Sequence, residues 1–364
     1  ESEVLWRHAV SPSGVNREFR PLLRMTFPPR TSDLTAAWRP GERLFRSWLL
    51  VAGFVPVEYD DLERPLVCAT KTVTIGKTEL DLTVWRLGDA WVLGVPVELF
   101  DKIVKNPKLD VVSRPARRSI FLALNNKPGS PTADIRVRKA MYMAIDEDEI
   151  IEKVMRGHAA PAAQIPDPPT IGYNPDIKRL NYDPAEAKKL LKEAGYENGF
   201  EITLSGPNDR YVQDAKIAEA VAKYLAKVGI KTTLDVKPKS VFFPEVTGGK
   251  LDFYLIGWFD GTFDMGRTYF KLAHTRDDET GHGFFNGANF SDPDIDKLLQ
   301  STADIVNPQE RGKVLQKLNK MAMVDKIAWI PLHYQEDLYA IQKGKGIKFQ
   351  PRPDRWMVYK EISK

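Results

Sequence analysis

The pattern of apolar and polar residues changes along the chain and divides it into differently built parts. In residues 66–100, short β-type segments are separated by Gly76-Lys77 and Gly88-Asp89, which predict turns. This pattern indicates three short strands, at 66–75, 80–87 and 91–95, that form a β-meander. From residue 117 onward, strand-like segments alternate with segments whose apolar residues recur at helical spacing, which predicts a mixed or parallel sheet flanked by helices.

The elements expected in this second part follow from periodicity and from residues that begin or end helices. The expected strands cover 118–125, 200–204, 231–236, 251–258, 328–332 and 337–341, and the expected helices cover 134–155 with a break at 146, 185–194, 214–228, 292–303 and 308–324. Asp183-Pro184 and Asp292-Pro293 mark two helix starts, because aspartate caps a helix well and proline suits its first position. The proline-rich stretch 157–175 is predicted to be a long surface loop.

Composition and charge exclude several kinds of partner. The 364 residues carry 53 Lys and Arg against 49 Asp and Glu, without a basic block, so no nucleic-acid partner is predicted. The longest apolar stretch, 48–57, is far shorter than the ~20 residues of a membrane span, so no membrane insertion is predicted. Residues 1–10 lack the basic and apolar regions of a signal peptide, so no signal peptide is visible in this chain.

Motifs that carry catalysis or hold a cofactor are missing from the sequence. Cys68 is the only cysteine, and no glycine-rich nucleotide motif or nucleophile elbow is present. The five histidines show no metal-ligand spacing, and His274 and His282 are interpreted as solvated loop residues. The acidic run 146–149 is better explained as a helix start than as a metal cluster. We therefore predict no enzyme activity, no cofactor and no metal site.

Several short motifs occur in the order typical of one protein family. They are PKLDVVS at 107–113, FLALN at 121–125, ADIRVRKA at 133–140 with AID at 144–146, GHA at 157–159, YDPAEAKKLLKEAGY at 182–196, GIK at 229–231, GW at 257–258 and DPDID at 292–296. Through these motifs, about residues 106–364 resemble solute-binding protein family 5, the peptide, nickel and oligosaccharide receptors of ABC importers.

The resemblance implies a periplasmic-binding-protein-like α/β fold, with a mixed sheet flanked by helices and, here, an N-terminal β-rich segment. The expected organisation is an irregular segment over 1–64, a β-meander over 65–105, a substrate-binding lobe over 106–332 and a return to the first lobe over 333–364. It also implies a receptor that captures a small solute, such as a peptide or a related polar molecule, in an inter-lobe cleft. The partner would be an ABC permease, and the location periplasmic or extracellular if the chain is exported.

The resemblance also suggests where the ligand binds. Peptide-binding members carry an aspartate in the loop after the G-W strand, where it pairs with the peptide amino group. In this chain Asp260 falls one residue early, Gly261 occupies the expected position and Asp264 matches a later acidic position, so peptide specificity stays open. The candidate ligand-binding residues are Trp258, Phe259, Asp260, Asp264, Arg267, Asn286 and Asn289. The aromatic residues would stack on a ligand, and Arg267 would suit a carboxylate.

The first hundred residues resemble other proteins. Residues 1–61 are similar to an SRPBCC-type protein, and 66–100 to the closing β-region of neutral ceramidases, notably LGVPVELF at 93–100. The alternatives are therefore a ceramidase-like amide hydrolase, or a mosaic and non-functional chimera with a folded C-terminal lobe. The hydrolase would need a histidine-rich zinc site, which the sequence lacks.

Overall fold

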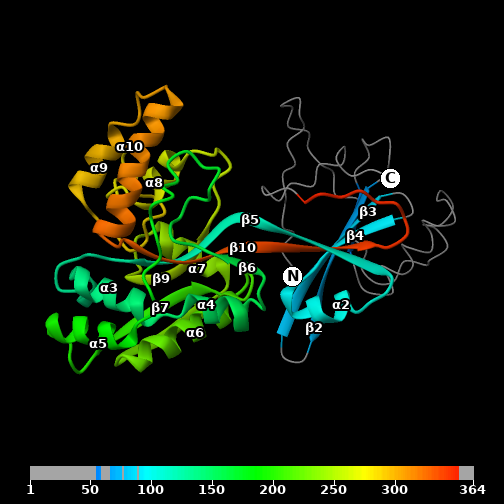
Figure 1. Ribbon diagram of the computed structural model, residues 1–364, viewed down its shortest axis with the longest axis horizontal. Helices are drawn as coiled ribbons and strands as arrows, with labels where there is room; N and C mark the ends of the chain where they lie inside the picture. The colour runs from blue at the N-terminus through cyan, green and yellow to red at the C-terminus, as the bar shows by residue number, and fades with distance from the viewer. Residues whose placement is uncertain (1–54, 59–65, 76–77, 88–89, 352–364) are drawn as a thin grey trace. The chain divides into compact units, whose positions relative to one another are not determined.

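The computed structural model describes residues 55–58, 66–75, 78–87 and 90–351 (Figure 1). The chain divides into two compact units, 1–93 and 94–364. The division falls inside the expected 65–105 segment, rather than at one of its ends. The predicted turns at 76–77 and 88–89 lie outside the described residues, as does most of the SRPBCC-like segment.

The first unit contains an antiparallel meander, as the alternating pattern predicts. β2 (Leu66–Ile75) pairs with β3 (Thr78–Leu87), and β3 pairs with β4 (Ala90–Gly94). A further strand that was not expected, β1 (Val55–Glu58), pairs with β2 on its other side. The predicted three-strand meander is confirmed, and Cys68 lies in β2 opposite Val57 of β1.

The second unit is built on a mixed sheet with the order β10-β5-β9-β7-β8, and β6 pairs with β10. Its strands are β5 (Leu109–Leu124), β6 (Ala159–Pro161), β7 (Phe200–Pro207), β8 (Ile230–Lys237), β9 (Phe253–Trp258) and β10 (Trp329–Gln342). β7 runs parallel to β8 and β9, whereas β5 runs antiparallel to β9 and β10. The two strands expected at 328–332 and 337–341 are parts of one strand, β10, which pairs with β5 with two register shifts.

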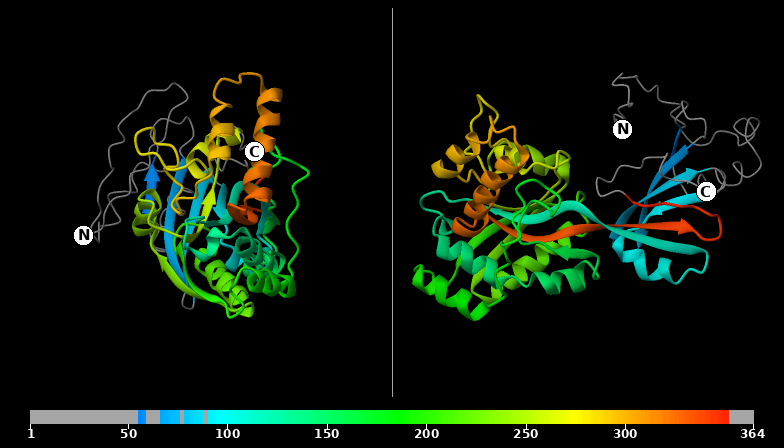
Figure 2. Two further views of the ribbon diagram at one scale, coloured as in Figure 1. Left: turned by 90° about the vertical axis from the view of Figure 1, so that its left-hand side faces the viewer. Right: turned by 45° about the horizontal axis from the view of Figure 1, so that its top comes forward.

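Helices flank this sheet, in agreement with the prediction. They are α2 (Phe100–Val104), α3 (Ile135–Ala144), α4 (Glu147–Glu149), α5 (Pro184–Glu193), α6 (Asp214–Lys227), α7 (Lys239–Thr247), α8 (Met265–Leu272), α9 (Pro293–Gln300) and α10 (Pro308–Lys320), with the short elements η1 (Val97–Leu99), η2 (Pro131–Ala133), η3 (Ile150–Val154) and η4 (Met321–Asp325). Figure 2 shows α3, α5 and α6 together as one group and α8, α9 and α10 as another.

The core of the second unit is centred on the end of β5. Residues 120–124 are almost completely buried, because β9 and β10 cover both edges of this part of β5 and helices cover the sheet. A strand buried in this way is apolar throughout, which explains the run IFLAL. The largest fully buried side chains around it include Tyr254, Tyr269 and Phe253.

The helix starts agree with the sequence. Asp183 accepts backbone hydrogen bonds from Ala185 and Glu186 at the start of α5, and Asp292 caps α9 in the same way. The break at Asp146 is confirmed, because its side chain caps α4 by accepting a hydrogen bond from the Glu149 backbone. These three aspartates serve helix termini, as their spacing to the helical segments predicts.

The proline-rich stretch differs from the prediction of a surface loop. It contains β6, and Gln164, Ile165 and Asp167 within it are buried. Asn319 of α10 donates a hydrogen bond to the Gln164 side chain, and Tyr334 of β10 donates to the Gln164 backbone carbonyl over 2.9 Å. Prolines prevent regular structure here, but these polar partners allow an irregular segment to be buried.

Candidate binding site at the end of strand β9

Trp258 is the last residue of strand β9 and directly follows Gly257. Because glycine has no side chain, β9 packs closely against its neighbours at this position. A Cβ atom at Gly257 would lie 2.7 Å from side-chain atoms of Ile120 and of Tyr211. The Tyr211 hydroxyl also donates a hydrogen bond to the Gly257 carbonyl over 3.0 Å. Trp258 is partly exposed, and its ring packs edge-on against Phe285. The G-W pair therefore combines a close-packed backbone position with an aromatic side chain at the strand end.

The loop after Trp258 is attached to the proline-rich stretch. The Ile171 backbone N–H donates to the Phe263 carbonyl over 2.9 Å, and the Met265 N–H donates to the Ile171 carbonyl over 3.1 Å. Phe263 has a φ of 58°, which is unusual for a bulky residue, and its side chain is 43% exposed. Two segments almost a hundred residues apart in sequence thus form one side of the site.

Asp260 carries a negative charge that no described Lys or Arg neutralises by an ion pair. One carboxylate oxygen accepts hydrogen bonds from the backbone and side chain of Thr262, and the other accepts from the Thr268 hydroxyl over 2.6 Å. The same hydroxyl accepts a hydrogen bond from Trp258 Nε1 over 3.0 Å. Trp258, Thr268 and Asp260 therefore form a chain of hydrogen bonds that fixes both the indole ring and the carboxylate.

A small cavity of about 10 Å³ lies beside this chain. Its lining residues are Arg117, Ile165, Pro166, Asp167, Thr170, Trp258, Asp260, Met265 and Thr268. The volume is about enough for one water-sized polar group. Two predicted site residues, Trp258 and Asp260, come together at this cavity. Phe259 lies nearby, with its ring 5.9 Å from the Arg117 guanidinium carbon.

Arg117 is a central residue of the site that the sequence interpretation missed. Its Nε and Nη2 atoms form hydrogen bonds with both carboxylate oxygens of Asp167, over 2.7 and 2.9 Å, and Nη2 also donates to the Thr170 hydroxyl over 2.7 Å. The guanidinium carbon lies 3.6 Å from the centroid of the Phe263 ring. The available signal was a charged residue within the strand, three positions before the apolar run 120–124, a position at which a partner for the charge is required.

Two predicted site residues on or next to α8 lie away from the cavity. Asp264 caps α8 by accepting a hydrogen bond from the Gly266 backbone and forms an ion pair with Arg311. Arg267 is exposed on α8 and does not line the cavity. The expectation that these residues share one ligand site with Asp260 is therefore not supported by their positions. The geometry assigns Asp264 to the folding of the loop.

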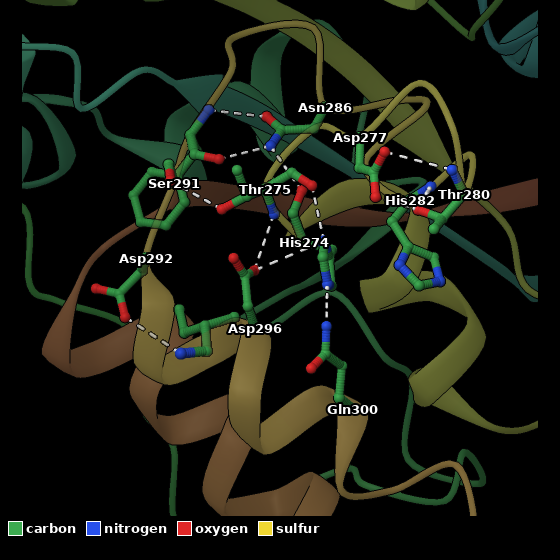
Figure 3. A network of polar contacts seen from close by, with 12 residues as sticks. His274, Thr275, Asp277, Thr280, His282, Asn286, Ser291, Asp292, Asp296 and Gln300 are labelled. Atoms are coloured by element: carbon green, nitrogen blue, oxygen red, sulfur yellow. Dashed lines mark hydrogen bonds and ion pairs between the residues drawn. The ribbon is translucent and has the colours of Figure 1, made fainter.

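Asn286 and Asn289 also support the backbone, as the close view in Figure 3 shows for Asn286. Asn286 is 2% exposed, donates to the carbonyls of Phe290 and His274, and accepts from the Phe290 N–H. Asn289 donates to the Gly249 carbonyl. Neither residue lines the cavity near Trp258. Their polar side chains are what the sequence prediction rests on, but an irregular loop needs such side chains to satisfy its own backbone groups.

His274 belongs to the same network, and the interpretation as a solvated histidine is wrong for it, because only 6% of the residue is exposed (Figure 3). Its Nδ1 lies 2.7 Å from the Thr275 carbonyl, and its Nε2 lies 3.3 Å from the Gln300 amide nitrogen. The carbonyl can only accept, so Nδ1 carries the proton and Nε2 accepts from Gln300. Across the described part of the chain, no group of three or more metal-ligating side chains is found.

Comparison with known proteins identifies the family. Residues 71–279 match the family described as bacterial extracellular solute-binding proteins, family 5 (middle part), which is more than half of the chain. The chain belongs to this family. The match begins earlier than the expected residue 106, so family 5 includes most of the 66–100 region that resembles neutral ceramidases. Residues 1–72 match a domain of unknown function, DUF8410, and the SRPBCC-type resemblance and the mosaic origin stay predictions.

The family 5 relatives include binding proteins for different solutes. Heme-binding protein A of Haemophilus influenzae is 31% identical over 240 residues, which are 64% of this chain and 42% of that protein. The glutathione-binding protein GsiB of Salmonella choleraesuis is 28% identical over 257 residues, which are 69% of this chain and 49% of that protein. The chain spans about half the length of these curated relatives.

Solved structures confirm the periplasmic-binding-protein-like fold. The periplasmic binding protein DppA of Helicobacter pylori, solved with the peptide STSA, is similar with a TM-score of 0.64 and 20% identity, over 84% of this chain and 63% of that one. HbpA2 of Haemophilus parasuis is similar with a TM-score of 0.66 and 21% identity, over 88% of this chain and 68% of that one. Family members of this kind are binding proteins rather than enzymes. Within the described residues, no helix is both long and apolar enough to cross a bilayer.

Proposed function

We propose that this family 5 protein is the solute-binding receptor of an ABC importer, and that it binds a small polar solute beside Trp258 and Asp260. The observation that carries the proposal is the hydrogen-bonded chain of Trp258, Thr268 and Asp260 at the cavity. It presents, at the end of β9, an aromatic ring and a carboxylate that forms no ion pair with any of the described residues. The proposed partner is an ABC permease, and the proposed location is periplasmic or extracellular.

The chemistry of this site favours a solute that carries an amine. A carboxylate held by two threonines is prepared to form a charge-assisted hydrogen bond with an ammonium group. Aromatic faces at Trp258 and Phe259 would add contact area and attract a cation. Peptides are one class of such solutes, and other amines are another. The inter-lobe cleft expected from the resemblance stays part of this proposal.

A thermal-shift screen of the 364-residue chain tests the proposal. The panel holds dipeptides, tripeptides, nickel chelates, sugars and simple amines, and each compound that raises Tm is then measured by calorimetric titration. A specific rise of Tm with an amine or a peptide is the expected result. Hydrolysis of an amide bond during incubation would instead support the ceramidase-like alternative. A flat response to the whole panel would overturn the receptor proposal and favour a non-functional chimera.

A further inference from the structure

A hollow of about 500 Å³ is formed by the second half of α5, the turn that follows it and the end of α6. Its lining residues are Lys188, Lys189, Leu191, Lys192, Glu197, Asn198, Lys227, Val228 and Gly229. The turns beside it lead into β7 and β8, whereas Trp258 lies at the end of β9, which runs parallel to β7. The hollow and the candidate binding site therefore lie at opposite ends of the strands and are separate.

The lining of this hollow is positively charged. Among the described residues that line it, four are lysines and one, Glu197, carries a carboxylate, so the excess is three positive charges. Glu197 pairs with Lys192 over 2.5 Å, and Lys189 pairs with glutamates of α5 that do not line the hollow. Lys188 and Lys227 form no ion pair with any described residue. Two ammonium groups at the hollow are thus available to an anion from outside the chain.

Helix stabilisation explains only part of this concentration of lysines. Lysine in the last turn of a helix interacts favourably with the helix dipole, and Lys192 and Lys227 occupy such positions. Lys188 instead lies in the middle of α5, one turn before Lys192, and like charges at this spacing destabilise a helix. The ends of α5 and α6 add a partial negative charge of about half a unit each, which leaves the hollow positive. An anion bound between the lysines would relieve their repulsion.

The shape of the hollow is fixed by the packing of its two turns. A Cβ atom at Gly199 would lie 1.8 Å from the Gly229 carbonyl oxygen, so the backbones of the two turns are in contact. Leu191 and Val228 of the lining are almost completely buried and belong to the core. The volume falls within the range of small-molecule sites, about 300–1,000 Å³. The lysines are thus carried by a frame that exists before a ligand binds.

The excess of charge determines which anion is suitable. A ligand with two or more negative charges would offset it, whereas a single carboxylate would leave most of it. Lysine ammonium groups bind phosphate oxygens as point charges, and a phosphate monoester concentrates about 1.5 to 2 negative charges in one group at pH 7. Lys188, Lys189 and Lys192 lie within five consecutive residues of α5, so the negative charges of the ligand must also be close together. Phosphate groups meet this requirement better than carboxylates, which carry one charge each.

We propose that the hollow binds a small soluble molecule with two or more phosphate groups, which accept hydrogen bonds from Lys188, Lys192 and Lys227. A bilayer surface also presents phosphate groups, but a hollow encloses a small molecule, whereas a flat surface would meet only its rim. The inference goes beyond the proposed receptor function and does not depend on it, because it concerns the opposite end of the strands.

Calorimetric titration of the 364-residue chain with orthophosphate, pyrophosphate and tripolyphosphate at constant ionic strength tests the proposal. We expect tripolyphosphate to bind about tenfold more tightly than orthophosphate, because more phosphate oxygens reach the lysines. Citrate, which offers carboxylates only, should bind more weakly than tripolyphosphate. A chain that binds neither pyrophosphate nor tripolyphosphate, or binds citrate as tightly, would overturn the proposal. Binding to phosphatidylglycerol vesicles without binding of the soluble phosphates would also overturn it and assign the lysines to a membrane surface.

Two double variants locate the site. Lys188→Gln combined with Lys192→Gln should weaken tripolyphosphate binding about tenfold. Lys313→Gln combined with Lys317→Gln is the matched control, because these lysines are also exposed and one turn apart on a helix, α10, but do not line the hollow. The control should bind as wild type does, and circular dichroism checks that both variants are folded. Equal weakening by both would show that only the net charge of the chain matters, which would contradict the proposed site.

Glu197→Gln should change the affinity in the opposite direction. It removes the one carboxylate among the described residues that line the hollow, so tripolyphosphate should bind about threefold more tightly. Weaker binding by this variant would count against the proposal. A chain that binds amines but no phosphate would lose this inference and keep the receptor function, and a chain that binds phosphate but nothing in the wider panel would do the reverse.

Discussion

Asp264 and Arg311 form a two-point ion pair, with distances of 2.5 Å from Oδ2 to Nε and 3.1 Å from Oδ1 to Nη2. The same Oδ1 accepts a hydrogen bond from the Gly266 backbone and so caps α8. A Cβ atom at position 266 would lie 2.5 Å from Arg311 Nη2, so a larger residue there would displace the guanidinium group from this position. Asp264, in the loop after Trp258, thus connects the start of α8 to α10.

Substitutions of Asp264 should therefore affect stability. Asp264→Ala removes both the cap and the ion pair, and we expect it to lower the free energy of unfolding by about 2 kcal/mol. Asp264→Asn keeps an N-cap oxygen and loses only the charge, so its loss should be about 1 kcal/mol. Urea denaturation measures both. If the two variants lost the same free energy of unfolding, the separate contributions of cap and ion pair would be disproved.

Substitution of Asp260 should affect ligand binding rather than stability. Its carboxylate lines the cavity without an ion-pair partner among the described residues, so Asp260→Asn should weaken binding of an amine probe about tenfold with little change of Tm. Asp264→Asn is the control and should leave the affinity unchanged. Calorimetric titration of one amine that raises the Tm of the wild-type chain measures both effects. Equal weakening by both variants would show that the two carboxylates share the ligand.

The buried carboxyl group of Glu147 should make the free energy of unfolding depend on pH. Burial raises the pKa of its carboxyl group to about 7, even though Arg179 lies 2.7 Å away and favours the charged form. The folded state therefore holds a proton that the unfolded state has released, and stability falls as the pH rises from about 4.5 to about 7. Glu147→Gln has no such titration.

The measurement compares urea denaturation of wild type and Glu147→Gln at pH 5 and pH 8. The variant should gain about 2–3 kcal/mol relative to wild type over this interval, since each unit of pKa shift corresponds to about 1.4 kcal/mol. Asp148→Asn is a useful control, because Asp148 also pairs with Arg179 but is exposed. A constant difference between wild type and Glu147→Gln at the two pH values would show that Glu147 is charged throughout.

The buried imidazole of His333 should make the protein less stable in acid. It is completely buried in β10, neither ring nitrogen has a hydrogen-bond partner among the described residues, and burial lowers its pKa to about 3. Between pH 6.5 and 3, the unfolded state binds a proton that the folded state does not, so stability falls as the pH decreases. His333→Phe should unfold at a lower pH than wild type in an acid titration followed by circular dichroism. His282→Gln, a change outside the sheet, should not shift this midpoint.

Local sequence patterns predicted the elements well where one segment carries its own signal. α6 is an example, because Ile217, Val221 and Leu225 recur at helical spacing and Gly229 follows the helix. β9 and the capped starts of α5 and α9 are further examples. α7 and α8 were missed, and α7 contains Pro244, a residue that normally argues against a helix interior. The sequence thus predicted the helices and strands whose own residues carry a clear periodic pattern or a capping residue.

The site was harder to predict because it depends on contacts between distant segments. Arg117 pairs with Asp167, fifty residues further along the chain, and neither position follows a local rule. Trp258 and Asp260 were found because the family resemblance marks their loop. Asn286 was predicted at the site because it is polar, but its side chain forms hydrogen bonds with backbone groups of its own loop. Only the folded chain separates these two roles.

The pairing of β5 with β10 has a consequence for how the chain reaches its native state. The two strands are hydrogen-bonded from Trp329 opposite Ala123 to Gln342 opposite Leu109, yet more than 200 residues separate them in sequence. During synthesis, β5 therefore lacks one neighbour until the residues of β10 have left the ribosome. A chain cut before Trp329 would expose the edge of β5 along its apolar segment 120–124 and be prone to aggregation. Pairing of β10 with β5 is thus the step that covers this edge and completes the order β10-β5-β9-β7-β8.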